Sequence, residues 1–267
     1  MPWLAPRLTD GLCNRLFQIV GADYHSRINK RPLVFYVPRI SPSAHSDCSL
    51  VLKLFPSVPV IWESPIIHTA VEGEKDFLSF KPLIIPDENT VVSGYFQNWG
   101  YFPKEQFKLD FKNTLSKESF ETNTLTQDMN PDKLWWIHVR LGDYSILPHH
   151  QCTDTEYWVN SLDKIPDGSV VLLFSDEVEK ARIIIENAAG FISRQIKILA
   201  CNPNLTAVET LYIMSQCGGG CIGSNSSFSY WGMYLSRAKE LGNPCILPSK
   251  WHRDYNGTMS APWLTNF

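Results

Sequence analysis

Hydrophobic positions along this chain alternate between short apolar runs and longer stretches with helical spacing. Runs of four to eight apolar residues are typical of strands, and apolar residues at i, i+3 and i+4 are typical of helices. In the N-terminal part the pattern predicts strands at 4–8, 33–37 and 91–92 and helices at 12–29 and 104–120. The proline-rich stretch at 41–89 shows no clear period.

The second half of the chain repeats a strand-then-helix rhythm more regularly. It predicts strands at 134–140, 169–174, 196–199, 221–222 and 245–247 and helices at 154–163, 176–188, 206–216 and 227–239. Alternating βα units form parallel sheets covered by helices. The polar segment 122–133, which contains Pro131, is the candidate linker. We therefore predict an α/β protein with two Rossmann-like lobes, residues 1–130 and 131–267, whose parallel sheets face a central cleft.

Composition excludes several classes of protein. The 267 residues carry a net charge of −3, which argues against a nucleic-acid partner because that would need a basic stripe. No apolar run approaches the roughly 20 residues of a membrane span, and the start lacks the pattern of a signal peptide. The seven scattered cysteines include no CxxC pair and favour a reducing compartment. We expect a cytoplasmic enzyme of the bacterial or viral type.

The segment 135–144, WWIHVRLGDY, is the most informative one. It predicts a buried strand that delivers the guanidinium of Arg140 to a carboxyl end, where α/β folds bind their ligands. Arginine binds phosphate well because its planar, permanently charged fork meets two oxygens at once. The simpler alternative is an Arg140–Asp143 ion pair that closes a turn.

A second segment, 221–232 (CIGSNSSFSYWG), leads from a short strand through small polar residues directly into a helix. The first turn of a helix has unpaired N–H groups and the positive end of the helix dipole, so it attracts anions. Ser226 or Ser227 could instead be a plain helix cap. Four consecutive small polar residues exceed what one cap requires, which favours ligand binding.

Three weaker segments add candidates. The turn Asp10-Gly11 precedes a helix and would let the backbone approach a ligand. Ser175-Asp176 ends a strand and suits either a helix cap or a hydrogen bond to a nucleoside. The segment 94–102, GYFQNWGYF, places aromatic rings beside amides, as sugar binding requires, although an ordinary core would also use them.

Several chemistries have no motif here. There is no P-loop, no HExxH, no G-x-S-x-G, and no Asp-x-Asp to hold a divalent metal against a diphosphate. The nearest match, Asp154-Thr155-Glu156, reads as the first turn of a helix. A leaving diphosphate would then be stabilised by cationic side chains and helix dipoles.

Taken together, these segments resemble the α-1,2-fucosyltransferases of glycosyltransferase family 11. The blocks that carry the resemblance occur in the family's order: GLCNRLFQ at 11–18, GYFQ at 94–97, HVRLGDY at 138–144, FSD at 174–176, NSSFSYWG at 225–232 and PSKW at 248–251. The resemblance covers nearly the whole chain and is weakest at 41–89.

The resemblance implies a GT-B-like fold, GDP-fucose as donor, a glycan acceptor, no metal and no other cofactor, and inversion at the anomeric carbon, most often in α-1,2 linkage. By position, Arg140 would hold the β-phosphate, and His138 with Ser175-Asp176 would lie by the guanosine. The diphosphate and fucose would be lined by Asn225, Ser226, Ser227 and Phe228. From the N-terminal lobe, Gly11 and Asn14 would reach the donor, and Tyr95, Gln97 and Trp99 would face the acceptor.

The chain departs from the family pattern at several positions. Leu141 replaces a second arginine of the HxRRGDY block, and Arg15 replaces a glutamine that could restore the lost charge. Thr210 occupies the position of an aspartate expected to read guanine, which makes the neighbouring Glu209 the candidate reader. Asp143 and Asp10 are the two candidates for the general base. The alternatives are a transferase that uses another sugar nucleotide, and a non-catalytic glycan-binding protein with the same fold.

Overall fold

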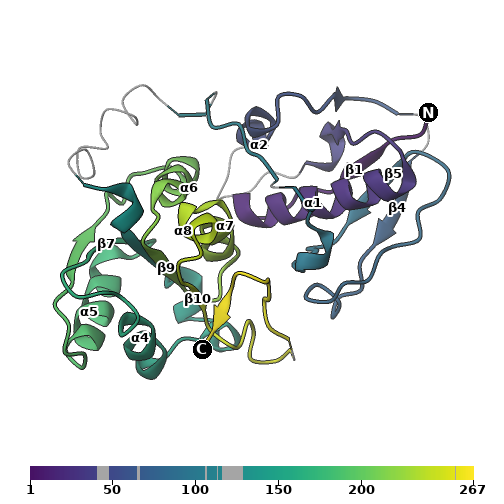
Figure 1. The fold of residues 1–267 in the computed structure, drawn as a ribbon. Helices are drawn as coiled ribbons and strands as arrows, with labels where there is room; N and C mark the ends of the chain where they lie inside the picture. Colours follow the sequence, from purple (N-terminus) through teal and green to yellow (C-terminus); the bar gives the residue numbers. More distant parts are fainter. Residues whose placement is uncertain (41–47, 65–66, 106, 113, 116–128, 256) are drawn as a thin grey trace. The chain divides into compact units, whose positions relative to one another are not determined.

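The computed structural model describes residues 1–267 except 41–47, 65–66, 106, 113, 116–128 and 256 (Figure 1). The chain divides into two compact units, Met1–Thr114 and Leu115–Phe267. Each unit is built around its own parallel sheet. Among the described residues, no helix combines the length and apolar character needed to cross a membrane.

The N-terminal unit contains a three-stranded parallel sheet in the order β1-β5-β4. Its elements in chain order are β1 (Leu4–Pro6), α1 (Leu12–Asn29), β2 (Phe35–Tyr36), α2 (Cys48–Leu54), β3 (Val60–Ile61), β4 (His68–Val71) and β5 (Thr90–Ser93). β2 and β3 form a separate parallel pair. No strand was predicted between 41 and 89, where the structure has β3 and β4. β4 lies at the edge of the three-stranded sheet, and its side chains are mostly exposed, so it lacks a clear apolar pattern.

Helix α1 packs against β1 and β5 through the apolar positions that predicted it (Figure 1). Leu12, Leu16, Ile19 and Val20 are all buried. The helix begins after Gly11 and ends at Lys30, which adopts the left-handed conformation with φ 52° and donates its N–H to the carbonyl of Arg27. The sequence thus predicted both ends of this helix.

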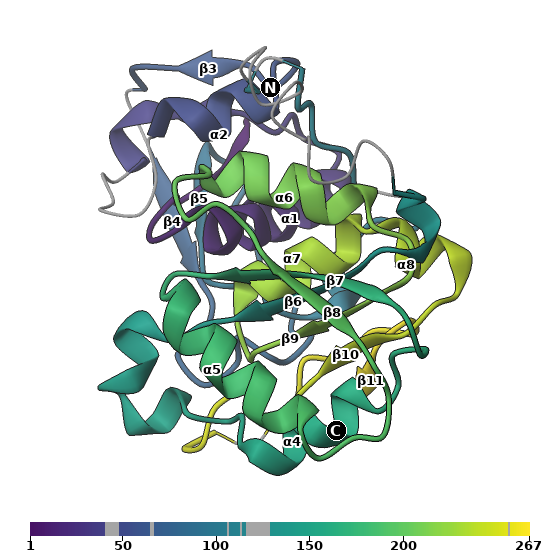
Figure 2. The ribbon, with the colours of Figure 1, turned by 90° about the vertical axis from the view of Figure 1, so that its left-hand side faces the viewer.

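The C-terminal unit is a six-stranded, fully parallel sheet in the order β11-β10-β9-β6-β7-β8. Its strands are β6 (Trp135–Val139), β7 (Val170–Ser175), β8 (Lys197–Ala200), β9 (Gly220–Gly223), β10 (Cys245–Leu247) and β11 (Thr265–Asn266). Its helices are α4 (Thr155–Leu162), α5 (Val178–Ala189), α6 (Ala207–Gln216), α7 (Ser227–Leu235) and α8 (Arg237–Leu241). In Figure 2, α4 and α5 cover one face of the sheet and α6, α7 and α8 the other.

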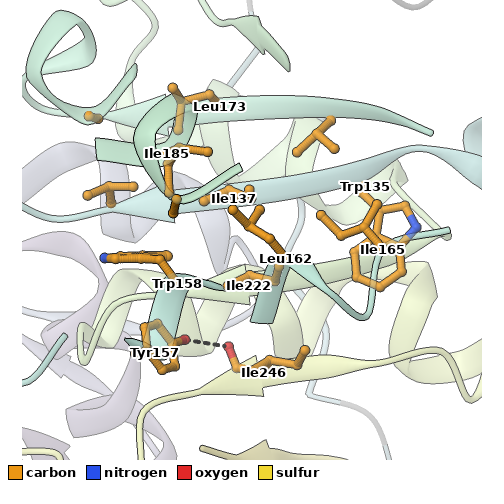
Figure 3. Packing of buried hydrophobic residues seen from close by; sticks show 14 residues of the cluster. Trp135, Ile137, Tyr157, Trp158, Leu162, Ile165, Leu173, Ile185, Ile222 and Ile246 are labelled. Atoms are coloured by element: carbon orange, nitrogen blue, oxygen red, sulfur yellow. Dashed lines mark hydrogen bonds between the residues drawn. The ribbon is translucent and has the colours of Figure 1, made fainter. Parts of the chain in front are cut away.

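The alternation of β6 sends its side chains to both helical layers. Trp135, Ile137 and Val139 belong to the core beneath α4 and α5 (Figure 3). Trp136 and His138 point to the opposite face, where Trp136 meets Gly232 of α7 and His138 meets Ser229. Because helices cover both faces of the sheet, every residue of this strand except His138 is apolar.

Tyr157 of α4 ties this core to two neighbouring strands. Its hydroxyl donates to the carbonyls of Gly223 (2.5 Å) and Ile246 (3.3 Å), the latter drawn in Figure 3. Asp154 caps α4 by accepting the N–H of Tyr157 at 2.8 Å. The Asp-x-Glu segment is therefore a helix start, as predicted.

Two predicted helices differ from the structure. The described residues of 104–115 form no helix: Phe107 packs its ring on Phe55, and the N–H of Asp110 donates to the carbonyl of Leu54 at 3.0 Å. Residues 116–120 of that prediction lie outside the described residues. The predicted helix 227–239 is two helices. Ser236 takes an extended conformation (ψ 140°) while its hydroxyl donates to the carbonyl of Cys217 at 2.6 Å, which ends α7 and caps α8.

Candidate functional site

The loops that follow β6, β7 and β9 meet at the carboxyl edge of the C-terminal sheet. These strands pair in parallel with Val139 opposite Ser175 and His138 opposite Gly223, so their ends lie at the same level. The fold therefore brings together three of the segments that the sequence singled out, 138–143, 175–176 and 224–228.

Arg140 lies at the centre of this edge and is held by two carboxylates. Its Nη2 is 2.7 Å from Asp143 Oδ1, and its Nη1 is 2.9 Å from Asp176 Oδ2. The guanidinium also lies over the ring of Tyr144 at 5.8 Å, and its side chain is one-quarter exposed. The ion pair offered as the simpler alternative exists, but a second acid from another strand shares the guanidinium.

Asp176 also fixes the backbone of the turn that carries Arg140. Its Oδ1 accepts the N–H of Leu141 at 2.9 Å. A Cβ added to Gly142 would lie only 2.4 Å from Asp176 Oδ2, so the turn approaches the carboxylate closely. Ser175 contributes locally, since its hydroxyl accepts the N–H of Glu177 at 3.0 Å and delays the start of α5 to Val178.

His138 is buried behind Arg140 and is neutral. Its Nδ1 is 2.7 Å from the hydroxyl of Ser229, and its ring packs on Phe228 with centroids 5.1 Å apart. Burial and the nearby charge of Arg140 lower the pKa of His138 to about 3. The residue therefore supplies shape and hydrogen bonding at neutral pH, with no charge.

The small polar residues after β9 hold the site together. The hydroxyl of Ser224 accepts the N–H of Arg140 at 3.0 Å, which joins the ends of β6 and β9. Asn225 is buried, and its amide nitrogen donates to the carbonyls of His150 (3.0 Å) and Trp251 (2.9 Å). Ser226 caps α7 by accepting the N–H of Phe228 at 3.2 Å. Both amide hydrogens of Asn225 are thus engaged within the protein.

Ser227 and Phe228 form the first turn of α7 and are half-buried. This turn follows directly on the β9 end and points its N–H groups to the carboxyl edge. A helix dipole contributes about half a positive charge at such an end. Arg140 and the start of α7 are therefore two sources of positive potential at one edge of the sheet.

Glu209 is committed to its own helix. Its Oε2 accepts the N–H (2.8 Å) and the hydroxyl (2.7 Å) of Thr206, while its N–H donates back to that hydroxyl at 3.2 Å. This capping box starts α6 at the carboxyl edge of β8. The guanine-reading role of Glu209 stays a prediction.

A shallow depression of about 540 Å³ lies at the same edge, between the first turn of α5 and the end of β8. Its walls include Glu177, Lys180, Ala200 and Asn202. Its lining begins at Glu177, the residue after the nucleoside-binding candidates Ser175 and Asp176.

In the N-terminal unit, the candidate residues also gather at a carboxyl edge. The amide of Gln97 donates to Asn14 Oδ1 at 3.3 Å, and the hydroxyl of Tyr95 donates to Asp10 Oδ2 at 3.0 Å. Gly11 is the N-cap of α1 and makes no side-chain cap. Burial, with the charge of Asp10, raises the pKa of Tyr95 to about 12. Asp10 is exposed and left-handed, with φ 63°.

Trp99 lies farther along the same segment and stacks on Phe102, with centroids 5.2 Å apart and planes inclined by 19°. It begins a short 3-10 turn that Asn98 caps. The structure thus connects Asn14 with Gln97 and Asp10 with Tyr95, while the ring of Trp99 stacks on Phe102.

Sequence reasoning missed Tyr144 and Glu72 as parts of these sites. The hydroxyl of Tyr144 donates to the carbonyl of Asn225 at 3.2 Å, so it ties the Arg140 turn to the β9 loop. Glu72 is buried after β4, and its Oε2 accepts the N–H groups of Tyr95 (2.7 Å) and Phe96 (3.0 Å). Tyr144 stood inside the recognised motif, whereas nothing in the sequence pointed to Glu72.

The comparisons with known proteins agree with this architecture. The model of glycosyl transferase family 11 matches residues 75–251, about two-thirds of the chain. Three similar solved structures are of the fucosyltransferase NodZ. One is NodZ α-1,6-fucosyltransferase co-crystallised with GDP, with a TM-score of 0.52, 15% identity, and coverage of 88% of this chain and 92% of that one.

The second is the same enzyme soaked with GDP-fucose, with a TM-score of 0.51, 14% identity and the same coverage. The third is NodZ from Bradyrhizobium, with a TM-score of 0.52, 15% identity and coverage of 88% and 93%. No curated protein matches significantly. The structural likeness shows a GT-B-like α/β fold, and the family match shows that this chain belongs to glycosyl transferase family 11.

Proposed function

We propose that this protein transfers L-fucose from GDP-fucose to a hydroxyl of a glycan acceptor, with inversion and in α-1,2 linkage. Membership of glycosyl transferase family 11 supports glycosyl transfer. Two similar NodZ structures come from crystals grown with GDP or soaked with GDP-fucose, which supports that donor, although NodZ itself is an α-1,6-fucosyltransferase. The α-1,2 linkage rests on the motif resemblance.

The observation that carries the proposal is the position of Arg140 beside the start of α7. A diphosphate needs fixed positive charge where its negative charge grows during departure. Asp143 and Asp176 contact only Nη1 and Nη2, which leaves other N–H donors of the five-donor guanidinium for phosphate oxygens. The N–H groups of the Ser227 turn supply the second anion site.

The carboxylates of Asp143 and Asp176 position Arg140, but they also make the net charge of the three groups negative. Arg140, Asp143 and Asp176 together carry a net charge of −1, which opposes a diphosphate. The α7 dipole offsets part of that charge. We assign Asp143 to holding the guanidinium, because its Oδ1 accepts a hydrogen bond from Arg140 Nη2 at 2.7 Å.

We propose Asp10, the other candidate, as the general base. Its carboxylate is exposed, and Tyr95 and Thr9 fix one oxygen through hydrogen bonds of 3.0 and 2.9 Å. A non-glycine residue held at φ 63° is uncommon, and such strain concentrates at functional sites. In the reaction, the acceptor oxygen forms a bond to the anomeric carbon, the bond to GDP breaks, and Asp10 takes the hydroxyl proton.

Each remaining residue has an assigned role. Ser175, Asp176 and His138 would lie by the guanosine, next to the depression between α5 and β8. Glu209 would read the guanine base by giving up part of its capping box. Gln97 and Trp99 would contact the acceptor, and Gly11 with Asn14 the donor. Neither a metal nor another cofactor takes part, because Arg140 and α7 supply the positive charge.

Calorimetric titration with GDP, UDP and dTDP in EDTA tests the donor. We expect GDP to bind best, and GDP-fucose then to label a member of an oligosaccharide panel whose product linkage NMR assigns. Preference for UDP or dTDP would keep the family and overturn the donor. An α-1,6 product would overturn the linkage alone. Binding of glycans without any effect of nucleotides would overturn the enzymatic proposal.

A further inference from the structure

Three histidines gather in the C-terminal unit outside the assigned donor residues. His149 and His150 come from the 3-10 turn after the Arg140 loop, and His252 comes from the loop after β10. One ring nitrogen from each lies within 4.8 Å of the others. Their ring centroids are 4.4 Å (149–150), 4.7 Å (149–252) and 5.0 Å (150–252) apart.

The backbone beneath this cluster is fixed by hydrogen bonds between the two loops. The buried amide of Asn225 donates to the carbonyls of His150 and Trp251, one residue from His252. The N–H of Arg253 donates to the carbonyl of His149 at 2.9 Å. The two loops are therefore joined on both sides of the imidazoles, and the cluster does not depend on side-chain rotamers alone.

Neighbouring groups also orient the rings. The Nδ1 of His252 accepts the N–H of Asp254 at 3.1 Å, which leaves Nε2 as its ligand atom. The ring of Tyr144 stacks on His150 with centroids 4.5 Å apart and planes 12° apart.

We propose that His149, His150 and His252 bind one zinc ion, with a fourth position open to water. Three imidazoles with an open position are a common zinc ligand set. At Zn–N distances of about 2.0–2.1 Å, tetrahedral ligand nitrogens lie roughly 3.3 Å apart. Side-chain rotation that brings the nitrogens together by about 1.5 Å or less would close the site from the present 4.8 Å limit.

This site is separate from the metal-free donor chemistry proposed above and does not depend on it. The ion would link the turn after β6 to the loop after β10, on either side of Asn225. Tyr144 connects the cluster with Arg140, because its ring contacts both. Zinc would therefore stiffen the loop that carries the donor site.

The test is titration of the metal-free, full-length protein with Co²⁺ and Zn²⁺. Tetrahedral Co²⁺ gives an intense visible spectrum, so we expect one such site per chain, from which Zn²⁺ displaces Co²⁺. His149→Ala and His252→Ala should each weaken binding at least roughly 100-fold, since loss of a mere outer partner already costs 10- to 100-fold. His68→Ala, which removes an exposed histidine of β4, should bind as the wild type does.

Thermal unfolding of each metal-free variant checks its fold, and zinc should raise the melting temperature of the wild type and the His68 variant only. Absence of a tetrahedral Co²⁺ spectrum in the wild type would overturn the proposal. So would equal binding by the wild type and the His252 variant, because the cluster would then be a stack of rings that holds the two loops together.

Discussion

Replacing Arg140 with alanine tests whether the site acts on a diphosphate. Arg140 is the cation shared by Asp143 and Asp176, so its removal leaves two carboxylates facing the leaving group. At an effective dielectric constant of about 20, the attraction between the Arg140 guanidinium and one unit of negative charge on the leaving diphosphate, about 5 Å away, stabilises the transition state by roughly 3 kcal/mol. That energy corresponds to a rate loss of about two to three orders of magnitude, which agrees with the removal of one oxyanion donor.

The assay is the initial rate of GDP release from GDP-fucose with a saturating acceptor, reported as kcat/KM. Arg140→Lys should recover part of the rate, because a lysine keeps the charge but lacks the fork that meets both acids. Arg194→Ala is the matched control. Arg194 is also partly exposed and paired with an acid, Asp163 at 3.6 Å, but it precedes β8 at the opposite edge of the sheet.

Folding should change little in these variants. Partly exposed ion pairs contribute at most about 1 kcal/mol each, and Arg140→Ala removes two of them, so its free energy of unfolding in urea should fall by no more than about 2 kcal/mol. A kcat/KM within a few-fold of the wild-type value, in a protein with normal unfolding, would refute the role of Arg140 and the charge argument behind it.

Three further predictions concern the same edge of the sheet. Gly142→Ala would place a Cβ 2.4 Å from Asp176 Oδ2 and should weaken GDP binding about tenfold by calorimetry, whereas Gly190→Ala, with 3.3 Å to its nearest neighbour, should leave affinity unchanged. Asn225→Ala removes one buried and one partly buried hydrogen bond and should lower the free energy of unfolding in urea by about 2–4 kcal/mol; a loss under about 1 kcal/mol would contradict its anchoring role. Since the pKa of His138 is lowered to about 3 in the folded protein, the unfolded chain binds the proton first as pH falls below about 6.5. Stability should therefore decline toward low pH by up to about 1.4 kcal/mol per pH unit from this group, and His138→Gln, measured by urea unfolding between pH 7 and 4, should have a shallower slope.

Local patterns predicted the elements that depend on local physics. The helix at 12–29 was predicted to its ends because its apolar stripe and the preceding Gly11 are visible in sequence. The described part of the predicted helix 104–120 is not helical, and its Phe107 packs on Phe55, over fifty residues away, a contact that no local pattern reveals. The break at Ser236 likewise depends on a distant acceptor, the carbonyl of Cys217.

The candidate site shows the same division. The sequence identified Arg140, Ser175-Asp176 and the 225–228 loop, because strands that end in polar residues mark the carboxyl edge of a parallel sheet. It could not predict that Asp176 shares Arg140 with Asp143, nor that both amide hydrogens of Asn225 are engaged by backbone carbonyls.

By itself, then, the sequence determined the α/β class, the family motifs, and the order of the elements from β6 to β10 except for the break between α7 and α8; it did not predict β11. These features follow from the spacing of apolar residues and from residue type, which determine local structure over short stretches of sequence. Only the tertiary structure decided which distant groups are partners: Glu72 with the backbone at 95–96, and His252 with His149 and His150. Hydrogen bonds and ligand sets depend on distances of a few ångströms between residues far apart in sequence, and only the packing of the sheet sets those distances.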